Sequence, residues 1–309
     1  MHIGILSCNN PRAENTPTPI QGSDRANGAE RIAQAAQEAG HKVSQWYTPR
    51  FCFGYEDGRA TVWYDGERFT GADVIVYRPG FVQEPTLHTY VPELLQKMGQ
   101  RVLNGTPKVL EIKNKMIQHM RLADAGIPMP RFALAKDPEA AKCAVEALGF
   151  PIIVKVSFGT HGKGVFYAGN WETFQPILDY LDVRDGNPVI LEEFIAAAKN
   201  KDIRAFVVGG RIVAAMERQA RSKDIRANAS IGGTGTAIQL SREDEALALR
   251  TAKLFDLDIA GVDLIRSERG TLVLEVNANP GFQELEACTG IDVARAIVED
   301  CVRAGGRLV

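Results

Sequence analysis

The sequence predicts an α/β protein with more than one domain. At the amino end, a β-rich run, a stretch with helical spacing that ends at Gly40 and a second β-rich run follow one another. This order indicates parallel strands joined by a crossover helix. Nearer the carboxyl end, two pairs of apolar runs flank short turns, which indicates antiparallel hairpins. A chain of 309 residues is long enough for two domains, or for three small ones.

Charge and composition exclude several classes of function. Lys and Arg number 36 and Asp and Glu number 38, which gives a net charge of −2, so a general attraction to nucleic acid is not expected. No apolar run is long enough to span a bilayer, and the first residues lack the form of a secretory signal. We therefore expect a cytoplasmic protein without membrane contact. The five cysteines and five histidines show neither metal-ligand spacing nor a disulfide framework.

The first part of the chain, residues 1–98, is expected to form a small parallel α/β domain. Its predicted elements are a strand at His2–Ser7, a helix from about 25 to 39, and strands at 41–47 and 72–77. No Gly-X-Gly-X-X-Gly follows the first strand, which disfavours a dinucleotide site. Arg78 comes directly after a strand, where the ligands of open α/β sheets gather. It is a candidate for binding a substrate carboxylate, and a solvated loop arginine is the equal alternative.

A helical region is predicted to begin at Thr106, as its N-cap, and to stop at Gly126. Pro107 suits the first helical position. Lys113 and Lys115 lie inside this region, and residues two apart on a helix do not face the same way. At most one of the two lysines is therefore expected to point into a site.

A glycine-rich loop joins two strands in the middle of the chain. The first strand, 151–156, contains Lys155, and the strand pattern resumes at Val165 after the loop. Glycines let backbone amides turn toward an anion, and the lysine adds a charge. The loop is not of the Walker type, which opens a helix and has Ser or Thr after Gly-Lys. Taken alone, it favours phosphate binding and an ordinary glycine-rich hairpin equally.

The main candidate site is a hairpin near the carboxyl end, residues 261–277. If its turn centres on Arg269, Asp263 faces Glu275 with Cβ atoms about 5 Å apart, and strand alternation places Asn277 on the same face. Facing carboxylates repel without a counter-charge, and an all-oxygen donor set suits magnesium or manganese. The alternative is a solvated edge hairpin. We favour the metal because apolar residues are expected on the opposite face, namely Val262, Leu264, Leu272, Leu274 and Val276.

A second predicted hairpin, residues 202–218, turns at Gly209-Gly210 and carries Arg204 and Arg218. Further polar residues follow it, namely Arg221, Arg226 and Asn228. Arginines gathered near a metal–phosphate site suit a reaction that develops negative charge. A basic surface stripe paired with acids is the alternative for this cluster.

Together these motifs resemble the ordered motif set of the ATP-grasp ligases, most closely the RimK-like branch. The resemblance covers about residues 100–300 and extends to the strand at 3–7. The motifs that carry it are Lys155, the loop from Gly159 to Gly164, Glu192-Glu193-Phe194-Ile195, Asp202-Ile203-Arg204, Arg226-Ala227-Asn228, Gly261-Val262-Asp263 and Glu275-Val276-Asn277-Ala278-Asn279-Pro280-Gly281. Each motif alone is weak, but their shared order argues against coincidence.

The resemblance implies an α/β fold in three parts with ATP between two β-sheets. These parts are an amino-terminal parallel α/β domain at 1–98, a central domain with a glycine-rich lid at 99–188 and a carboxy-terminal domain at 189–309. The resemblance also implies nucleotide contacts by Lys115, Lys155, the lid residues Gly159, Thr160, Gly162 and Gly164, the adenine linker Glu192, Glu193, Phe194 and Ile195, and Asp202 near the ribose. Asp263, Glu275 and Asn277 would hold Mg²⁺ or Mn²⁺, with two ions expected. Arg226 and Asn228 would orient the reacting phosphates, with Arg204 and Arg218 as further substrate contacts.

RimK-like enzymes add glutamate or another amino acid through its amine to a carboxylate of a peptide, protein or small molecule. The carboxylate first takes the γ-phosphoryl group of ATP, which gives an acyl phosphate and ADP, and the amine then displaces phosphate. The resemblance therefore implies an ATP-dependent ligase, expected to be a dimer or tetramer. Two alternatives stay open: a ligase for a carrier-protein-bound amino acid, as in lysine biosynthesis, and a nucleotide-binding regulatory protein without catalysis.

Two segments depart from the family pattern. Ile231 stands before Gly232-Gly233, where the family commonly has a basic residue, so the resemblance leaves open whether the added amino acid is acidic. Residues from about 9 to 84 match the family poorly. This is where acceptor specificity is expected to lie.

Overall fold

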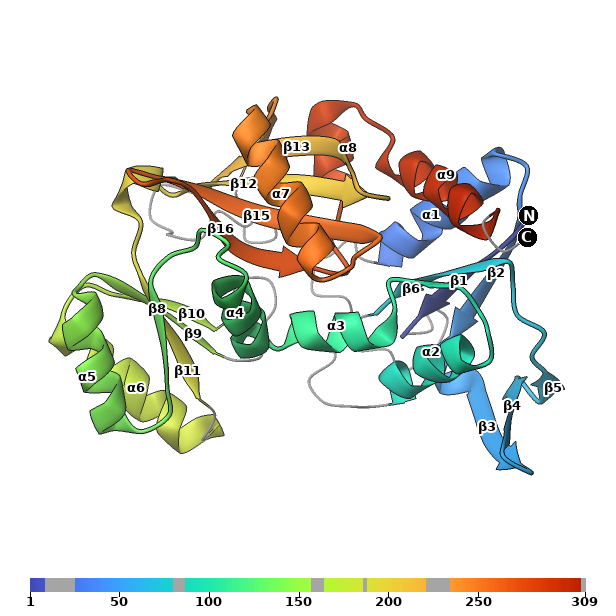
Figure 1. Ribbon diagram of the computed structural model, residues 1–309, viewed down its shortest axis with the longest axis horizontal. Helices are drawn as coiled ribbons and strands as arrows, with labels where there is room; N and C mark the ends of the chain where they lie inside the picture. The colour runs from blue at the N-terminus through green and yellow to red at the C-terminus, as the bar shows by residue number, and fades with distance from the viewer. Residues whose placement is uncertain (9–25, 80–86, 157–163, 186–187, 221–233, 307–309) are drawn as a thin grey trace.

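The structure is a computed structural model that describes residues 1–8, 26–79, 87–156, 164–185, 188–220 and 234–306. These residues form a mixed α/β fold with four β-sheets (Figure 1). The predicted α/β class is confirmed. The sheets occur in chain order as an amino-terminal parallel sheet, a small antiparallel insertion, a central sheet and a carboxy-terminal sheet.

The amino-terminal sheet has the strand order β2-β1-β6-β7, and its neighbouring strands are parallel. Its strands are β1 (His2–Ser7), β2 (Lys42–Tyr47), β6 (Val74–Arg78) and β7 (Val102–Leu103). Ile3 and Ile5 pack on one face against α1 (Ala26–Glu38) and α9 (Val293–Gly305), the last helix of the chain. Leu6 packs on the other face with α2 (Leu87–Lys97). The predicted strand, helix and parallel strand are thus confirmed.

A three-stranded antiparallel sheet is inserted between β2 and β6 and projects from the body at the lower right of Figure 1. The insertion consists of η1 (Thr48–Arg50), β3 (Phe51–Glu56), β4 (Arg59–Tyr64) and β5 (Glu67–Arg68). Asp57 and Gly58 form the β3–β4 turn, both with positive φ. No strand was predicted from the sequence between residues 48 and 71.

The predicted helical region is two helices, α3 (Thr106–Lys113) and α4 (Lys115–Asp124). The N-cap of α3 is Gly105, so the assignment of Thr106 as N-cap is wrong by one residue. The break lies at Asn114, whose side chain accepts hydrogen bonds from the backbone N–H groups of Met116 and Ile117 at 3.0 and 3.2 Å. An asparagine that bonds the following amides starts a new helix instead of continuing the old one.

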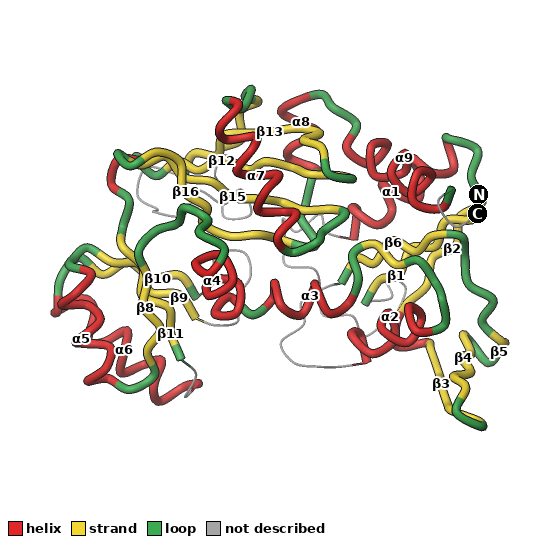
Figure 2. Tube along the Cα trace, viewed as in Figure 1, coloured by secondary structure: helices red, strands yellow, loops and turns green. Residues whose placement is uncertain are grey.

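The central sheet has the order β10-β9-β11-β8 and is antiparallel. Its strands are β8 (Phe132–Ala135), β9 (Ile152–Val156), β10 (Val165–Ala168) and β11 (Val189–Glu193). Helices α5 (Pro138–Leu148) and α6 (Trp171–Asp185) lie together on one side of these strands (Figure 2). They enclose an apolar core of their own that includes Val145, Val154 and Phe174. The two strands predicted on either side of the glycine loop are confirmed, and they pair with each other.

The carboxy-terminal sheet is antiparallel with the order β14-β13-β12-β15-β16. Its strands are β12 (Lys201–Val208), β13 (Arg211–Gln219), β14 (Thr234–Ala237), β15 (Ile259–Ser267) and β16 (Gly270–Asn277). One face packs on α7 (Arg242–Leu254), and α8 (Gln283–Thr289) contacts β13 and β14. The turn predicted between β12 and β13 is confirmed, because Val208 pairs with Arg211 and both turn glycines, Gly209 and Gly210, have positive φ.

The β15–β16 hairpin confirms the predicted pairing of Asp263 with Glu275, but the predicted position of its turn is wrong. Ser267 pairs with Gly270, so the turn is not centred on Arg269. A bulge next to Asp263 then shifts the register by one residue, which restores the expected pairing. The bulge brings Val273 opposite Leu264, on the face that packs against α7. The expectation that Leu272 and Leu274 lie on that face is therefore wrong.

Helix α4 lies against β16, the edge strand of the carboxy-terminal sheet. The side-chain amide of Gln118 donates to the Val276 carbonyl at 2.9 Å and accepts from the Val276 N–H at 2.9 Å. The same helix also reaches the central sheet, because the His119 ring contacts Phe132 of β8 at 5.2 Å between centroids. Helix α4 therefore connects the two sheets.

The three predicted domain ranges stay predictions, and the sheets cross two of their limits. Strand β7 at 102–103 belongs to the amino-terminal sheet, beyond residue 98. Strand β11 begins at residue 189, yet pairs with β8 and β9 of the central sheet.

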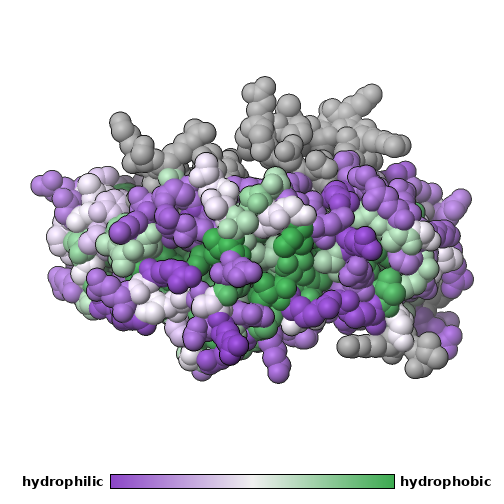
Figure 3. Space-filling view, turned by 90° about the horizontal axis from the view of Figure 1, so that it is seen from above, coloured by the Kyte–Doolittle hydropathy of each residue, from purple (hydrophilic) through white to green (hydrophobic). Residues whose placement is uncertain are grey.

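On the face seen from above, hydrophilic side chains predominate among the described residues and apolar ones gather near the middle (Figure 3). Large exposed apolar side chains include Tyr55 and Met120, which lie on separate elements. Within the described ranges, no helix is both long enough and apolar enough to cross a membrane.

Candidate active site

Charged side chains form a row across the face of the carboxy-terminal sheet that does not pack on α7. The row is set by strand pairing: Asp202 lies opposite Arg218, Arg204 opposite Asp263, and Asp263 opposite Glu275. Alternate residues of the same strands, such as Ala205 and Val262, are buried in the core on the α7 side. Strand alternation therefore turns the charged residues to one side and the apolar ones to the other.

The arginines hold the aspartates in a buried network. Arg204 bonds both oxygens of Asp263, with Nη2–Oδ2 at 2.8 Å. Arg218 bonds both oxygens of Asp202 at 2.6 and 2.9 Å and also reaches Asp263 Oδ2 at 2.9 Å. Burial raises the pKa of Asp202, and the Arg218 guanidinium only partly offsets this. The Asp263 carboxylate is thus bound by the guanidinium groups of both Arg204 and Arg218.

Glu275 and Asn277 continue the row on β16. Lys115 Nζ lies 2.5 Å from Glu275 Oε2, and Asn277 Nδ2 donates to Glu275 Oε1 at 3.2 Å. Burial would raise the pKa of Glu275, but the Lys115 ammonium and the more distant Lys155 hold it well below its usual value. Lys115 is the first residue of α4 and follows the Asn114 cap. The break between α3 and α4 therefore fixes the backbone position from which the Lys115 side chain extends to Glu275.

A second group of charges belongs to the central sheet and α4. Lys155 Nζ lies 2.7 and 2.6 Å from the two carboxylate oxygens of Glu192. His119 Nε2 lies 2.5 Å from Glu192 Oε1, and its Nδ1 lies 2.6 Å from the Lys115 carbonyl oxygen. Burial would raise the pKa of Glu192, but Lys155 and His119 lower it to about 2. His119 is not among the site residues predicted from the sequence.

The segment after Glu192 is ordered by main-chain and ion-pair contacts. The N–H groups of Glu193 and Phe194 donate to the carbonyls of Arg131 and Pro151 at 3.0 and 3.2 Å. The Glu193 carboxylate bonds Arg131, with Nε at 2.9 Å, and also Arg269 from the β15–β16 turn. Glu193 therefore ties the central sheet to the carboxy-terminal sheet beside the candidate site.

Of the predicted residues of the glycine loop, only Gly164 lies within the described residues. Gly164 has φ +82°, and a Cβ there would lie 2.3 Å from Val156 Cγ2, so this end of the loop requires glycine. Five predicted site residues lie outside the described residues: Gly159, Thr160, Gly162, Arg226 and Asn228. Ile231 also lies outside them.

Arg78 contacts the segment that follows the β15–β16 hairpin. It is only half-buried, and its Nη2 donates to the Pro280 carbonyl at 3.1 Å. Its guanidinium carbon lies 5.6 Å from the centre of the Phe282 ring. The Asn279 side chain in turn donates to the carbonyl of Pro79. The carboxyl end of β6 thus meets the segment that follows Asn277.

The donor set suits a magnesium ion that takes part of its coordination from a nucleotide. Asp263 and Glu275 supply carboxylates from directly paired positions, and Asn277 supplies an amide next to Glu275. Among the described residues, no group of three or more His, Cys, Asp or Glu side chains is placed to hold a metal. Magnesium usually keeps waters and phosphate oxygens in its shell, so two carboxylates and one amide are sufficient.

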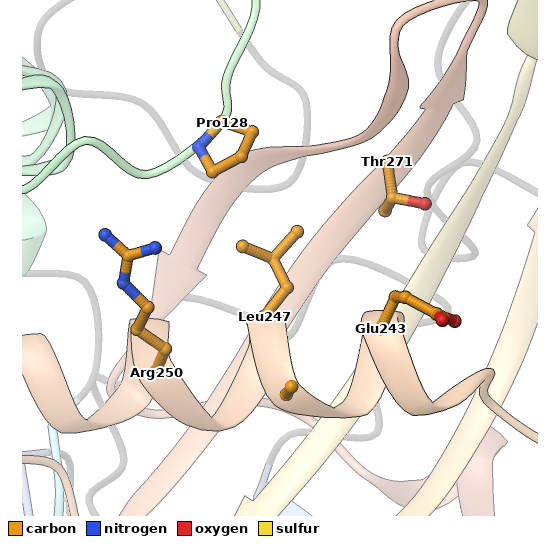
Figure 4. A pocket seen from close by; sticks show the side chains of 6 residues that line it. Pro128, Glu243, Leu247, Arg250 and Thr271 are labelled. Carbon is orange, nitrogen blue, oxygen red and sulfur yellow. The ribbon is translucent and has the colours of Figure 1, made fainter.

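A surface hollow of about 330 Å³ lies elsewhere, beside α7 (Figure 4). Pro128, Leu247, Arg250 and Thr271 are among its lining residues. Because α7 covers the opposite face of the sheet from Asp263, this hollow is not part of the charged site.

Comparison with known proteins identifies the family. A family model described as the RimK-like ATP-grasp domain matches residues 112–301. A probable alpha-L-glutamate ligase of Stenotrophomonas maltophilia strain K279a is 38% identical over 272 residues, which cover 87% of this chain and 92% of that protein. A protein of the same description from Methanococcoides burtonii is 32% identical over 280 residues, covering 89% of this chain and 91% of that protein.

Solved structures share the fold over almost the whole chain. The ATP-grasp ligase PsnB, complexed with a minimal precursor, superposes with a TM-score of 0.75 at 20% identity, covering 98% of each chain. The macrocyclase MdnC of Microcystis aeruginosa MRC, bound with precursor peptide MdnA, gives a TM-score of 0.71 at 17% identity and covers 98% of this chain and 100% of that chain. The chain therefore belongs to the RimK-like ATP-grasp family and is an ATP-dependent ligase.

Proposed function

We propose that this ligase joins the amine of glutamate or a similar amino acid to a carboxylate of a peptide, protein or small-molecule acceptor. The observation that carries the proposal is the meeting of two charged groups at α4: Lys115 with Glu275 of the carboxy-terminal sheet, and Lys155 with Glu192 of the central sheet. A lysine from α4 and a lysine from the central sheet, next to a row of carboxylates, suit a bound nucleoside triphosphate. The curated relatives named as probable alpha-L-glutamate ligases support glutamate as the added amino acid.

The nucleotide would lie between the two sheets. Lys115 and Lys155 would donate to its phosphates, the segment from Glu192 to Ile195 would hold adenine, and Asp202 would lie near the ribose. The loop that contains Gly159, Thr160, Gly162 and Gly164 would cover the phosphates. Excluding water there protects a reactive acyl group from hydrolysis.

Magnesium would be held by Asp263, Glu275 and Asn277, and manganese and a second ion are part of the same proposal. A solved structure of PsnB contains Mg and ADP, which supports this assignment. When bound, the ion would neutralise charge on the phosphate oxygens. The Lys115 ammonium contacts Glu275, and the two guanidinium groups contact Asp263, so the protein itself supplies counter-charges for these buried acids.

The chain's own residues would act on charge in the phosphoryl step. An acceptor carboxylate and the γ-phosphate repel by roughly 4 kcal/mol for two unit charges at 4 Å and an effective dielectric of 20. Arg204, Arg218 and Arg226 would offset this repulsion, and Asn228 would orient the γ-phosphate. The acceptor oxygen attacks phosphorus and ADP leaves. The amine nitrogen then attacks the acyl carbon, phosphate leaves and the nitrogen loses a proton.

Arg78 would bind a carboxylate of the acceptor or of the added amino acid. Solved neighbours were determined with precursor peptides, which supports a peptide as one class of acceptor. A carrier-protein-bound amino acid is the alternative acceptor, and a dimer or tetramer is the proposed assembly.

A pooled substrate assay tests the function. Purified protein with ATP, Mg²⁺, glutamate among a panel of amino acids, and carboxylate acceptors should release ADP and phosphate in equal amounts. Mass spectrometry of the products should show an acceptor heavier by one or more amino-acid residues. Glu275→Ala, checked for a native circular dichroism spectrum, should give no product. Nucleotide binding without phosphate release from any combination would instead favour the regulatory alternative.

A further inference from the structure

His119 is a buried histidine that contacts both charged groups of the site. Its side chain is about 1% exposed and lies on α4 between Lys115 and Glu192. Nε2 lies 2.5 Å from Glu192 Oε1, and Nδ1 lies 2.6 Å from the Lys115 carbonyl oxygen. The Phe132 ring packs edge-on against it from β8.

The partners determine the protonation of the ring. A backbone carbonyl only accepts hydrogen bonds, so Nδ1 must carry a proton. Glu192 receives Lys155 on both of its oxygens, and an ionised carboxylate also only accepts. The contact at Nε2 is a hydrogen bond only when Nε2 carries a proton as well, so both contacts together require an imidazolium.

We propose that His119 is a positioning residue of the nucleotide site: its imidazolium holds Glu192 so that Lys155 can turn to the nucleotide phosphates. This inference rests on the proposed function, in which Lys155 contacts ATP. Glu192 is almost fully buried, and a buried carboxylate that loses its only counter-charge is strongly destabilised. With His119 protonated, Glu192 keeps one cation when Lys155 moves away.

The charges around the ring agree with this role. The groups that face His119 or its partners are Lys115 on α4, Glu192 on β11, Lys155 on β9, and Glu275 on β16 through Lys115. The charges of these four groups cancel, so the site sums to +1 with an imidazolium and to zero with a neutral ring. A net positive charge in a buried site favours binding of a polyphosphate. The Nδ1 contact also holds the Lys115 carbonyl, so the same ring contacts the backbone of Lys115 and the carboxylate that pairs with Lys155.

The test compares binding of Mg-ADP by calorimetry in matched variants. His119→Met fills the space without a donor, His119→Gln keeps a donor without a charge, and Phe132→Leu removes the ring that packs on His119. We expect His119→Met to weaken binding by roughly ten-fold or more, His119→Gln by less, and Phe132→Leu by less than two-fold. The ¹⁵N spectrum of the wild-type ring at neutral pH should show a proton on both nitrogens.

The outcomes separate this inference from the proposed function. If the wild type does not bind Mg-ADP, the proposed function fails, and the inference fails with it. If the wild type binds and His119→Met binds equally well, only the role of His119 is refuted. Equal weakening in Phe132→Leu and His119→Met would show that packing alone matters. Should His119→Met not fold, the spectrum decides, because a neutral ring overturns the inference.

Discussion

One carboxylate oxygen of Glu275 accepts a hydrogen bond from the Lys115 ammonium, and the other accepts one from the Asn277 amide. Glu275→Gln keeps the size and removes the charge that a cation requires. We expect turnover to fall on the order of 100-fold, and half-maximal activity to need more Mg²⁺. Steady-state kinetics at several Mg²⁺ concentrations measure both. Glu268→Gln, in the exposed turn of the same hairpin, should behave as wild type, and equal activity in both variants would remove Glu275 from the metal site.

Glu192 makes stability depend on pH. Its folded pKa of about 2 lies below the unfolded value of 4.5, so its stabilisation is present above pH 4.5 and is lost as the pH falls toward 2. The shift corresponds to about 3 kcal/mol. The difference in unfolding free energy between wild type and Glu192→Gln should therefore be largest near neutral pH and shrink toward pH 2. Denaturant titrations measure it, with Glu139→Gln at an exposed pair as a control that should show a small, nearly constant difference.

At this scale, the sequence predicted partnerships better than the reasons for them. The pairing of Asp263 with Glu275 was correct because a misplaced turn and an unforeseen bulge cancelled. Bulges depend on packing with other elements, so the local pattern does not reveal them. His119 was missed because its partner Glu192 lies 73 positions away, and a single histidine on a helix carries no spacing signal.

At the scale of elements, the start of α4 depends on its N-cap residue, Asn114. Asn114→Ala removes the side chain that bonds two amides of the first turn and should destabilise the protein by about 1 kcal/mol. Because Lys115 begins that turn, the affinity for Mg-ADP should also fall. Asp137→Ala is the matched control: Asp137 caps α5 in the same way, but away from the site. It should lower the melting temperature comparably and leave affinity unchanged. Unchanged affinity in both variants would contradict the role of the cap.

The signals for two elements were present in the sequence but were not used. Asn114 directly before Lys115 is a typical N-cap, and it divides the region that was predicted as one helix. The alternation of Phe51, Phe53 and Tyr55 before Asp57-Gly58 is a hairpin signal, and β3 and β4 form there. The hairpins with the strongest turn chemistry, such as Gly209-Gly210, were predicted correctly.

At the scale of the whole molecule, one apolar core contains residues from both ends of the chain, whereas another contains only residues from its middle. One core joins α1 and β1 to α9, and another belongs to the central sheet alone. Ile297→Ala in α9 should lower the unfolding free energy by roughly 2–5 kcal/mol and speed amide exchange in β1 and β12 together. Val145→Ala in α5 should act mainly on β9 and β11. Exchange measured by mass spectrometry tests this, and equal effects of both variants on all four strands would show one undivided cooperative unit.

The three-part arrangement followed from the family resemblance and not from residue patterns. Local patterns state which residues are apolar, but not that the last helix completes the core of the first sheet. Contacts such as that of Arg78 with Pro280, 202 positions apart, depend on how the parts assemble.

The pairing of Gln118 with Val276 has a consequence beyond the site. An edge strand exposes unpaired N–H and C=O groups and can recruit a strand from another molecule. Here one side-chain amide occupies both groups of Val276, as a neighbouring backbone would. The border of the sheet is therefore closed to strand addition at this residue, because an incoming strand would first have to displace the Gln118 amide.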